Sequence, residues 1–369
     1  MLGDLDRARA LMHRDNLDTL LVVSRDNVYY LGDFSTLDPT DKSALILPAN
    51  DEPTLLQSKS DENVIPKDCW VKDRKFFGQF YIEGAANNEG DFRNLAEGVC
   101  AILKAKHLKQ IGIEDKSIPF ELYQTLRKSL PDCDFRMASG LLEELRTIKS
   151  DIEIDRLRRA ARMWEDSVIS VYGQISEGMA ESAVANALKA AVASRGGDCI
   201  WVEMGGLVGF PTLPSENQLH RGDILHIDMG ATCNGYGTDM ARDAVLGEPN
   251  DRQRKVNNAL TYALKKAVES VRAGVKASDV FKIGQQAVRD AGFPLYWRHN
   301  IGHGIGLRCH ENPVLTPTNQ IELRTGMVIN IEIPYYIKGF AAFNVESTMA
   351  VTKDGSNLLS TLDRDLYVL

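Results

Sequence analysis

The chain has 369 residues, of which 44% are hydrophobic and 25% are charged. This composition is typical of globular proteins, and at about 100–200 residues per domain the length predicts two domains. The net charge of −8, without a basic run, argues against nucleic acid or an anionic membrane as a partner. The N-terminal stretch lacks the apolar core of a signal peptide, and no later stretch approaches the roughly 18 apolar residues of a membrane span.

The cysteines are far apart and form no CxxC pair. Free buried thiols in a reducing compartment are therefore expected, rather than a disulfide framework or a zinc site, and we predict a cytoplasmic protein. The six positions are Cys69, Cys100, Cys133, Cys199, Cys233 and Cys309.

The first part of the chain, residues 1–145, alternates strand-like and helix-like segments. The apolar runs at 17–24 and 43–48 are short and bounded by Asp, Ser and Pro, which is typical of buried strands. The segments at 94–105 and 119–130 have helical spacing. An α/β domain is expected here, and no residue cluster in it indicates chemistry.

A new helix is expected to begin near residue 150. Ser150 followed by Glu153 fits a capping box, in which side chain and backbone cap each other at a helix start. Apolar residues then recur at helical spacing, at Ile154, Leu157, Ala161, Trp164 and Val168. A second domain, residues 146–369, is therefore predicted.

The second domain repeats one order of elements. Helices at about 151–172 and 180–195 precede a strand pair, and helices at about 250–272 and 278–291 precede further strands from about 299. This order indicates an internal pseudo-repeat of an α+β fold, although the halves share no convincing identity. Two such halves packed together would face their strands toward one cleft.

The segment HIDMGATCNGYGTDMARD (226–243) carries two aspartates, Asp228 and Asp239, on the two strands of a predicted hairpin. A turn centred between Cys233 and Asn234 would pair the two acids directly, and a turn centred on Asn234 and Gly235 would place them diagonally. Because side chains alternate with period two, either register puts both carboxylates on the same face. Adjacent like charges destabilise a sheet, so these acids need a solvated surface or a counter-charge.

Two later apolar strands each contain a glutamate. In MVINIEIPYYI (327–337) Glu332 shares a face with Val328 and Asn330, and in AAFNVESTMAV (341–351) Glu346 shares a face with Asn344. A glutamate in a core strand is costly unless a proton, a cation or a metal neutralises it. Two of them beside two paired aspartates favour a metal.

Three of the seven histidines fall within HNIGHGIGLRCH, at His299, His303 and His310. Four carboxylates and an imidazole form a hard, oxygen-rich ligand set, which suits two divalent ions bridged by carboxylates. Manganese is the expected metal, with cobalt, zinc or iron as alternatives. Metals about 3.5–4 Å apart can share a hydroxide nucleophile and polarise a substrate carbonyl.

At these residues the sequence resembles the pita-bread metallopeptidases, a family that includes methionine aminopeptidase, prolidase and aminopeptidase P. NVYYLGDF (27–34) and LRTIKSDIEIDRLRRAAR (145–162) are similar to the N-terminal domain and linker helix of the creatinase/prolidase branch. GDILHIDMGATCNGYGTDMARD, GHGIGLRCHENP and MVINIEIPYY resemble its catalytic segments. The resemblance covers nearly the whole chain and implies a creatinase-like N-terminal domain before a pita-bread catalytic domain.

The resemblance also implies roles for individual residues. Asp228 would bind one ion, His303 and Glu332 would bind the second, and Asp239 and Glu346 would bridge both. Glu332 would also be the general base, and His310 and His299 would contact substrate and stabilise the tetrahedral intermediate. A homodimer is expected on the same ground.

Two positions depart from the family pattern. Peptidases of this branch usually carry a further histidine upstream of the first ligand, where this chain has Phe210 and Pro211; His220 lies too close to Asp228 to replace it. Prolidases and aminopeptidases P often place an arginine two residues before the last ligand, where this chain has Asn344. An amide cannot neutralise a carboxylate, so Asn344 and Phe210 are candidate substrate contacts for an unusual substrate.

The leading interpretation is a two-metal hydrolase that cleaves a peptide or amide bond, similar to Xaa-Pro aminopeptidase or prolidase. The alternative is a small-molecule C–N hydrolase or lyase on the same scaffold, similar to ectoine hydrolase, creatinase or dimethylsulfoniopropionate lyase. A non-catalytic binding module is a third class, and the five retained ligands argue against it. Arg242 follows Asp239 closely, but alternation points it to the opposite face.

Overall fold

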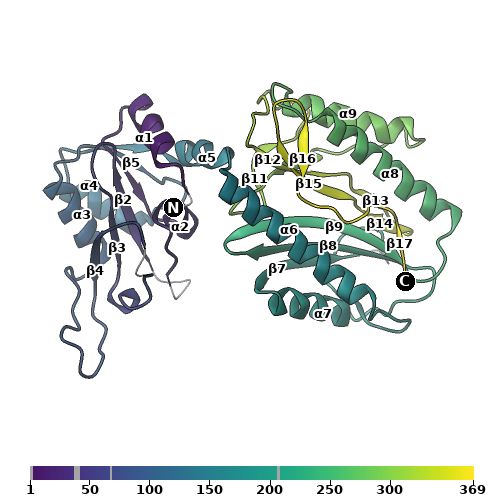
Figure 1. The fold of residues 1–369 in the computed structure, drawn as a ribbon, viewed down its shortest axis with the longest axis horizontal. Helices are drawn as coiled ribbons and strands as arrows, with labels where there is room; N and C mark the ends of the chain where they lie inside the picture. The colour runs from purple at the N-terminus through teal and green to yellow at the C-terminus, as the bar shows by residue number, and fades with distance from the viewer. Residues whose placement is uncertain (1–2, 37–41, 67–68, 206–207) are drawn as a thin grey trace. The chain divides into compact units, whose positions relative to one another are not determined.

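The computed structural model describes residues 3–36, 42–66, 69–205 and 208–369. The chain divides into two compact units, Met1–Arg146 and Thr147–Leu369 (Figure 1). Gly206 and Leu207, the start of the segment in which the family histidine is missing, lie outside the described residues.

The first unit is an α/β domain around a mixed sheet of order β4-β3-β2-β1-β5-β6. β1 is buried along its whole length, and the core between the sheet and α3 and α4 is apolar. The predicted strands and helices of this unit are confirmed. Its elements are α1 (Leu5–Arg14), β1 (Thr19–Val22), α2 (Arg25–Gly32), β2 (Ala44–Pro48), β3 (Thr54–Ser58), η1 (Lys59–Asp61), β4 (Asp73–Phe77), α3 (Leu95–Ala105), β5 (Gln110–Ile113), α4 (Phe120–Ser129), β6 (Asp134–Met137) and α5 (Ser139–Thr147).

The second unit opens with α6, and the predicted capping box is present. The Ser150 side chain accepts from the Glu153 backbone, and the Glu153 side chain accepts from the Ser150 backbone. In Figure 1, α6 and α7 cover a sheet of order β17-β9-β8-β7. The elements of this half are α6 (Asp151–Tyr172), α7 (Glu181–Ser194), β7 (Gly197–Met204), β8 (Ile224–Cys233), β9 (Tyr236–Val245) and β17 (Tyr367–Val368).

The hairpin between β8 and β9 turns at Asn234 and Gly235, which both have positive φ, 51° and 77°. Asn and Gly are the residues that tolerate this conformation in a tight hairpin turn. In this register Gly230 pairs with Asp239, so Asp228 lies diagonal to Asp239 on the same face. The second of the two predicted registers is therefore confirmed.

The second half of the unit repeats the arrangement. α8 and α9 cover a sheet of order β11-β10-β12-β15-β16, and the two-stranded sheet β13-β14 lies beside it (Figure 1). The predicted pseudo-repeat of two helices followed by strands is confirmed. The elements are α8 (Asp251–Ser270), α9 (Ala277–Asp290), β10 (Gly302–Gly304), β11 (Glu311–Val314), β12 (Val328–Glu332), β13 (Tyr335–Ile337), β14 (Ala341–Phe343), β15 (Glu346–Val351) and β16 (Ser356–Leu358).

The two glutamate-bearing strands are each shorter than predicted. The segment 327–337 is interrupted after Glu332, where Pro334 has no N–H to donate, and the segment 341–351 is interrupted before Glu346. β13 and β14 pair with each other, whereas β12 pairs with β15, and Glu332 is opposite Glu346 in that pairing. Both glutamates therefore lie where the chain passes from one sheet to another.

The two large sheets face each other, since β9 contacts both β12 and β15. Each sheet packs its outer face on its own helices through a separate apolar core. The alternation predicted for the second sheet is confirmed, because its outward-facing apolar residues all lie in the core against α8 and α9: Met327, Ile329, Ile331, Ile333, Phe343, Val345 and Met349. The polar residues of both sheets are left between them.

The segment after β16 is held by two buried charged side chains. The Glu165 carboxylate accepts from the backbone nitrogens of Thr361 (2.5 Å) and Leu362 (2.6 Å). Arg242 donates to the carbonyl oxygens of Leu362 (3.0 Å) and Asp363 (2.9 Å). Arg242 therefore points away from the acids of β8 and β9, as its alternation predicts, and burial lowers its pKa to about 10.

We expect Glu165→Ala to lower the free energy of unfolding of the second unit by about 1–3 kcal/mol, because it leaves two partly buried backbone N–H groups without their acceptor. Thermal unfolding, compared with the exposed control Glu269→Ala, measures the effect. An equal loss of stability in the two variants would contradict the assigned role of Glu165.

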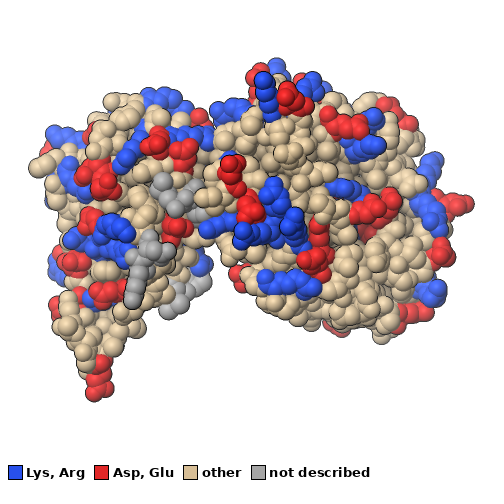
Figure 2. Space-filling view, viewed as in Figure 1, with Lys and Arg blue, Asp and Glu red and all other residues tan. Residues whose placement is uncertain are grey.

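Among the described residues, all six cysteines are free. No helix in the described part of the chain is long and apolar enough to cross a membrane. On the face drawn in Figure 2, acidic and basic side chains are interspersed over both units, with basic groups gathered over the first half of α6.

Candidate metal centre

The predicted acids meet between the two sheets. Asp228 and Asp239 come from β8 and β9, and Glu346 comes from β15; one carboxylate oxygen of each lies within 4.8 Å of those of the other two. Glu332 lies opposite Glu346 on β12. Asp239 and Glu346 are buried, whereas Asp228 and Glu332 keep partial exposure, so the cluster is open to solvent on their side.

Two of the predicted histidines join the acids. The Nε2 atoms of His303 and His310 each lie 3.3 Å from Asp239 Oδ2, and the two rings are 4.1 Å apart. His303 is buried and its Nδ1 lies 3.0 Å from the Gly304 carbonyl oxygen, which fixes the ring and leaves Nε2 for a ligand. His310 is 64% exposed at its side chain, so substrate can reach it.

The buried surroundings of the cluster disfavour four ionised carboxylates without a counter-charge. Burial, followed by the charges of neighbouring acids, raises the pKa values of Asp228 and Glu346 well above the ordinary range. Burial also raises the pKa of Glu332. Burial disfavours a charged His303, but Asp239 and Glu332 together outweigh it and raise the His303 pKa.

This donor set fits divalent cations. Without a positive charge the acids would have to hold protons, and the single buried histidine cannot neutralise four of them. Carboxylate oxygens with one imidazole nitrogen suit manganese, iron, cobalt or zinc. Asp239 belongs to both groups of neighbouring ligand atoms, one with Asp228 and Glu346 and one with His303 and His310. A shared carboxylate between two such groups is the arrangement expected of two adjacent ions.

Two buried amides orient Glu346. Asn330 Nδ2 donates to Oε2 (2.8 Å) and Asn344 Nδ2 donates to Oε1 (2.6 Å), while Thr348 donates to Asn330 Oδ1 (3.0 Å). Each oxygen of Glu346 therefore keeps a lone pair for a cation. Asn344 also opposes the rise in the Glu332 pKa through a hydrogen bond. Asn344 is fully buried, and its side chain therefore holds the neighbouring carboxylates in position.

We expect Asn344→Leu to weaken metal binding by about 10–100-fold, since the loss of a hydrogen bond to a metal ligand typically has this effect. Titration of the metal-free protein with Mn²⁺ measures the change. Asn257→Leu, which replaces a buried asparagine of α8 that donates to the Arg364 carbonyl oxygen, is the matched control and should keep the wild-type affinity. Unchanged affinity in Asn344→Leu would contradict the role of Asn344.

Two other predicted residues lie apart from the cluster. His299 is exposed in the segment before β10 and belongs to neither group of candidate ligands. Phe210 is 46% exposed in the segment between β7 and β8. Both remain candidate substrate contacts.

Three side chains that the sequence did not single out surround the acids. Trp201 stacks on His310 at 5.6 Å and opposes the rise in the Asp228 pKa through a hydrogen bond. The one feature of the sequence that relates to this position is Gly230, because a Cβ atom at that residue would collide with the Trp201 ring. Tyr336 lies near Asp228, whose charge contributes after burial to a raised Tyr336 pKa. Arg298 stacks over the Tyr336 ring at 5.0 Å.

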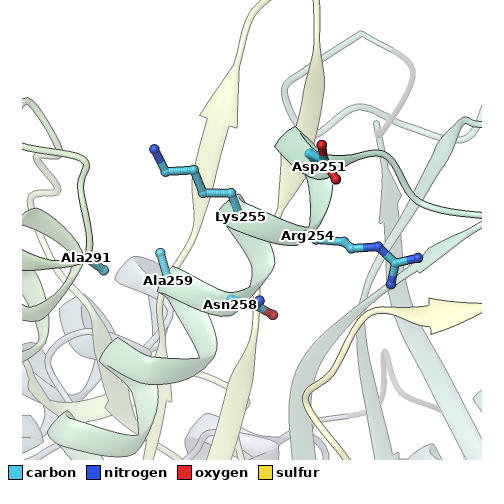
Figure 3. Close-up of a pocket in the computed structure, with 6 residues that line it drawn as sticks. All are labelled: Asp251, Arg254, Lys255, Asn258, Ala259 and Ala291. Atoms are coloured by element: carbon cyan, nitrogen blue, oxygen red, sulfur yellow. The ribbon is translucent and has the colours of Figure 1, made fainter.

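A surface depression of about 450 Å³ on α8 is lined by Asp251, Arg254, Lys255, Asn258, Ala259 and Ala291 (Figure 3). No acid of the cluster lines it. The side chains of Arg254 and Lys255 point in different directions in Figure 3, so the depression offers no converging polar groups. The candidate site is therefore the acidic cluster.

Comparison with known proteins agrees with this geometry. Residues 155–353 match metallopeptidase family M24, and residues 5–148 match the creatinase/prolidase N-terminal domain. An Xaa-Pro dipeptidase of Pyrococcus horikoshii is 28% identical over 360 residues, which cover 96% of each chain.

Solved structures show the same fold over the whole chain. The prolidase of Pyrococcus horikoshii OT3 is similar with a TM-score of 0.83 and 26% identity, covering 98% of this chain and 99% of that one. The X-Pro aminopeptidase of Thermotoga maritima MSB8 has a TM-score of 0.86 at 21% identity, covering 98% and 100%. The predicted fold class is confirmed. The chain thus belongs to metallopeptidase family M24, with a creatinase/prolidase-type N-terminal domain followed by a pita-bread catalytic domain.

Proposed function

We propose that the chain is a two-metal peptidase that hydrolyses the bond before proline in Xaa-Pro substrates. The observation that carries the proposal is the convergence of Asp228, Asp239 and Glu346 with His303 between two sheets, with Asp239 common to both groups of ligand atoms. Glu332 lies opposite Glu346 on the neighbouring strand. The relatives named Xaa-Pro dipeptidase and prolidase support the substrate class.

Five residues would hold the ions: Asp228, Asp239, His303, Glu332 and Glu346. Two divalent cations supply Lewis acidity, which lowers the pKa of water and polarises the scissile carbonyl. Manganese is the metal we propose, as carboxylate-rich sites suit it.

Other side chains around the ions would transfer protons, stabilise the oxyanion and contact the substrate. Glu332 is partly exposed beside the cluster, and a pKa raised by burial suits it to take a proton from water and return it to the leaving amine. His310 is exposed against Asp239 and can donate to the developing oxyanion. His299 and Phe210 are proposed substrate contacts further out. Trp201 stacks on the His310 ring, with the ring centres 5.6 Å apart.

A second candidate is a small-molecule C–N hydrolase or lyase on the same scaffold, similar to ectoine hydrolase, creatinase or dimethylsulfoniopropionate lyase. Two observations favour it: the family histidine has no counterpart at Phe210 and Pro211, and Asn344 is occupied with Glu346. Both positions are associated with peptide recognition in the relatives that the sequence resembles.

A substrate panel distinguishes the two candidates. Metal-free protein, reloaded separately with Mn²⁺, Co²⁺, Zn²⁺ and Fe²⁺, is assayed with Xaa-Pro dipeptides, longer Xaa-Pro peptides and small amides. We expect cleavage of Xaa-Pro peptides, and greatest activity with Mn²⁺. Turnover of small amides alone would favour the second candidate, and metal-independent cleavage of Xaa-Pro peptides would exclude the proposed two-metal peptidase.

We also propose a homodimer, by resemblance to the family, and a reducing, cytoplasmic compartment, in which the six free thiols would stay unpaired. Equilibrium sedimentation tests the first point.

A further inference from the structure

A buried pair of side chains lies on the first sheet, further along the strands that carry the aspartates. His226 of β8 and Asp243 of β9 are cross-strand partners, and His226 Nδ1 lies 2.8 Å from Asp243 Oδ1. Both side chains are fully buried. Because side chains alternate along a strand, the pair is on the same face as Asp228 and Asp239. Neither residue of the pair belongs to the groups of candidate ligand atoms found among the described residues.

Asp243 connects this pair to the second sheet. Its Oδ2 accepts a hydrogen bond from the backbone nitrogen of Asn344 at 2.9 Å, in the short connection between β14 and β15. The same asparagine donates through Nδ2 to Glu346 Oε1 at 2.6 Å. A continuous chain of hydrogen bonds therefore runs from His226 on the first sheet to a candidate bridging ligand on the second.

Strand β9 holds the connection between β14 and β15 with two consecutive side chains. Asp243 accepts from the Asn344 amide, and Arg242 donates from Nη1 to the carbonyl oxygen of Glu346 at 2.8 Å. Both ends of the three-residue segment that finishes at Glu346 are thus fixed to β9. Asp239 lies on the same strand, so β9 carries one candidate bridging carboxylate and holds the backbone of the other.

The network has features that stability alone would not favour. His226 Nε2 and Asn344 Oδ1 are buried and find no hydrogen-bond partner in the part of the chain that the structure describes. A buried polar atom without a partner lowers stability, and an apolar pair of similar size would avoid this cost. An apolar side chain in place of Asp243 could not, however, accept from the Asn344 amide.

We propose that Asp243 is a positioning residue of the metal centre, which fixes where Glu346 of the second sheet stands relative to Asp239 of the first. His226 holds the Asp243 carboxylate in the rotation that directs Oδ2 to Asn344. The inference rests on the proposed function, because it concerns how the carboxylates of the two ions are spaced. It adds a residue that acts through the backbone and contacts neither ion.

The test titrates metal-free variants with Mn²⁺ and follows binding by calorimetry and electron paramagnetic resonance. We expect Asp243→Leu to weaken Mn²⁺ binding by about 10–100-fold, as the loss of an outer partner of a metal ligand typically does, and to change the spectrum of the coupled pair. Asp243→Asn should recover the wild-type affinity and spectrum, because its Oδ1 can accept from the Asn344 amide while its Nδ2 donates to His226. Wild-type affinity and spectrum in Asp243→Leu would overturn the inference.

Glu153→Leu is the matched control for loss of a buried, hydrogen-bonded carboxyl group. Glu153 accepts from the Ser150 backbone nitrogen at 2.8 Å and the Tyr236 hydroxyl at 3.0 Å. This variant should have a lower Tm with unchanged Mn²⁺ affinity; a loss of affinity equal to that of Asp243→Leu would overturn the inference. If Asp243→Leu does not fold, His226→Phe combined with Asp243→Leu takes its place with the same expected result, because it leaves no ring nitrogen unpaired.

Hydrogen exchange of the Asn344 amide in the metal-free proteins gives a readout that needs no ion. Exchange in Asp243→Leu should be about tenfold faster than in the wild type, the effect of losing one hydrogen bond, and Asp243→Asn should keep the wild-type rate. If the wild type binds no Mn²⁺, the proposed function fails, while the exchange rate still decides whether Asp243 holds the segment that bears Glu346. An unchanged rate in Asp243→Leu overturns the inference.

Discussion

Asp239→Ala is expected to abolish metal-dependent turnover while the chain still folds. Asp239 contributes to both groups of candidate ligand atoms, so its removal weakens both cation positions at once. The Lewis acidity of bound ions is worth several kilocalories per mole in such reactions, and the loss in kcat should therefore be about a thousandfold or more. The measurement is kcat with Leu-Pro together with metal content per chain.

The matched control is Asp198→Ala on β7, which removes an exposed acid of the same sheet outside the cluster. This variant should keep its metal and its activity. Folding of both variants is checked by circular dichroism. Full activity in Asp239→Ala would refute the assignment of the site.

The stabilisation that Mn²⁺ gives should grow as pH rises. Burial, with the charges of neighbouring acids, raises the pKa values of Asp228 and Glu346 in the folded protein without metal. In the unfolded chain these groups titrate at about 3.9 and 4.3. Above about pH 4 the folded state thus holds more protons than the unfolded state, and the free energy of unfolding falls as pH rises toward the raised values. Cations bind the deprotonated ligands, so the free energy of unfolding of the metal-bound protein does not fall in this way as pH rises.

Thermal unfolding with chelator and with saturating Mn²⁺ at several pH values measures the effect. Each proton held only by the folded state costs about 1.4 kcal/mol per pH unit, so the difference in Tm should widen by about 3–6 °C per unit from about pH 5 up to the raised pKa values. Asp228→Asn, which cannot titrate, should flatten this slope. A Tm difference that does not depend on pH in the wild type would contradict the buried, charge-coupled site.

Local patterns in the sequence predicted much of the fold. Ser150 and Glu153 marked the start of α6, because a capping box depends on residues three apart. Side chains alternate between the two faces of a strand, so the sequence placed Asp228 and Asp239 on the same face in either register. Which register forms depends on the turn, and the positive φ values of Asn234 and Gly235 select it.

Features that depend on distant partners were not predictable from local pattern. The strands end beside Glu332 and Glu346 because the residues between them form their own hairpin, β13-β14, and β14 contacts β8 far earlier in the chain. Trp201 lies next to a β-bulge in β7, which shifts its register against β8. The Asn344 side chain faces the acids, as alternation predicted, but only the packing reveals that it bonds Glu346.

The measurement that tests the central claim most directly is a titration of the metal-free protein with Mn²⁺, followed by electron paramagnetic resonance. Two ions about 3.5–4 Å apart and bridged by carboxylates couple their spins. We predict binding that saturates at about two Mn²⁺ per chain, with the spectrum of a coupled pair that is absent in Asp239→Ala. Saturation at one ion, or two ions with the spectra of isolated Mn²⁺, would contradict a shared centre at Asp228, Asp239, His303, Glu332 and Glu346.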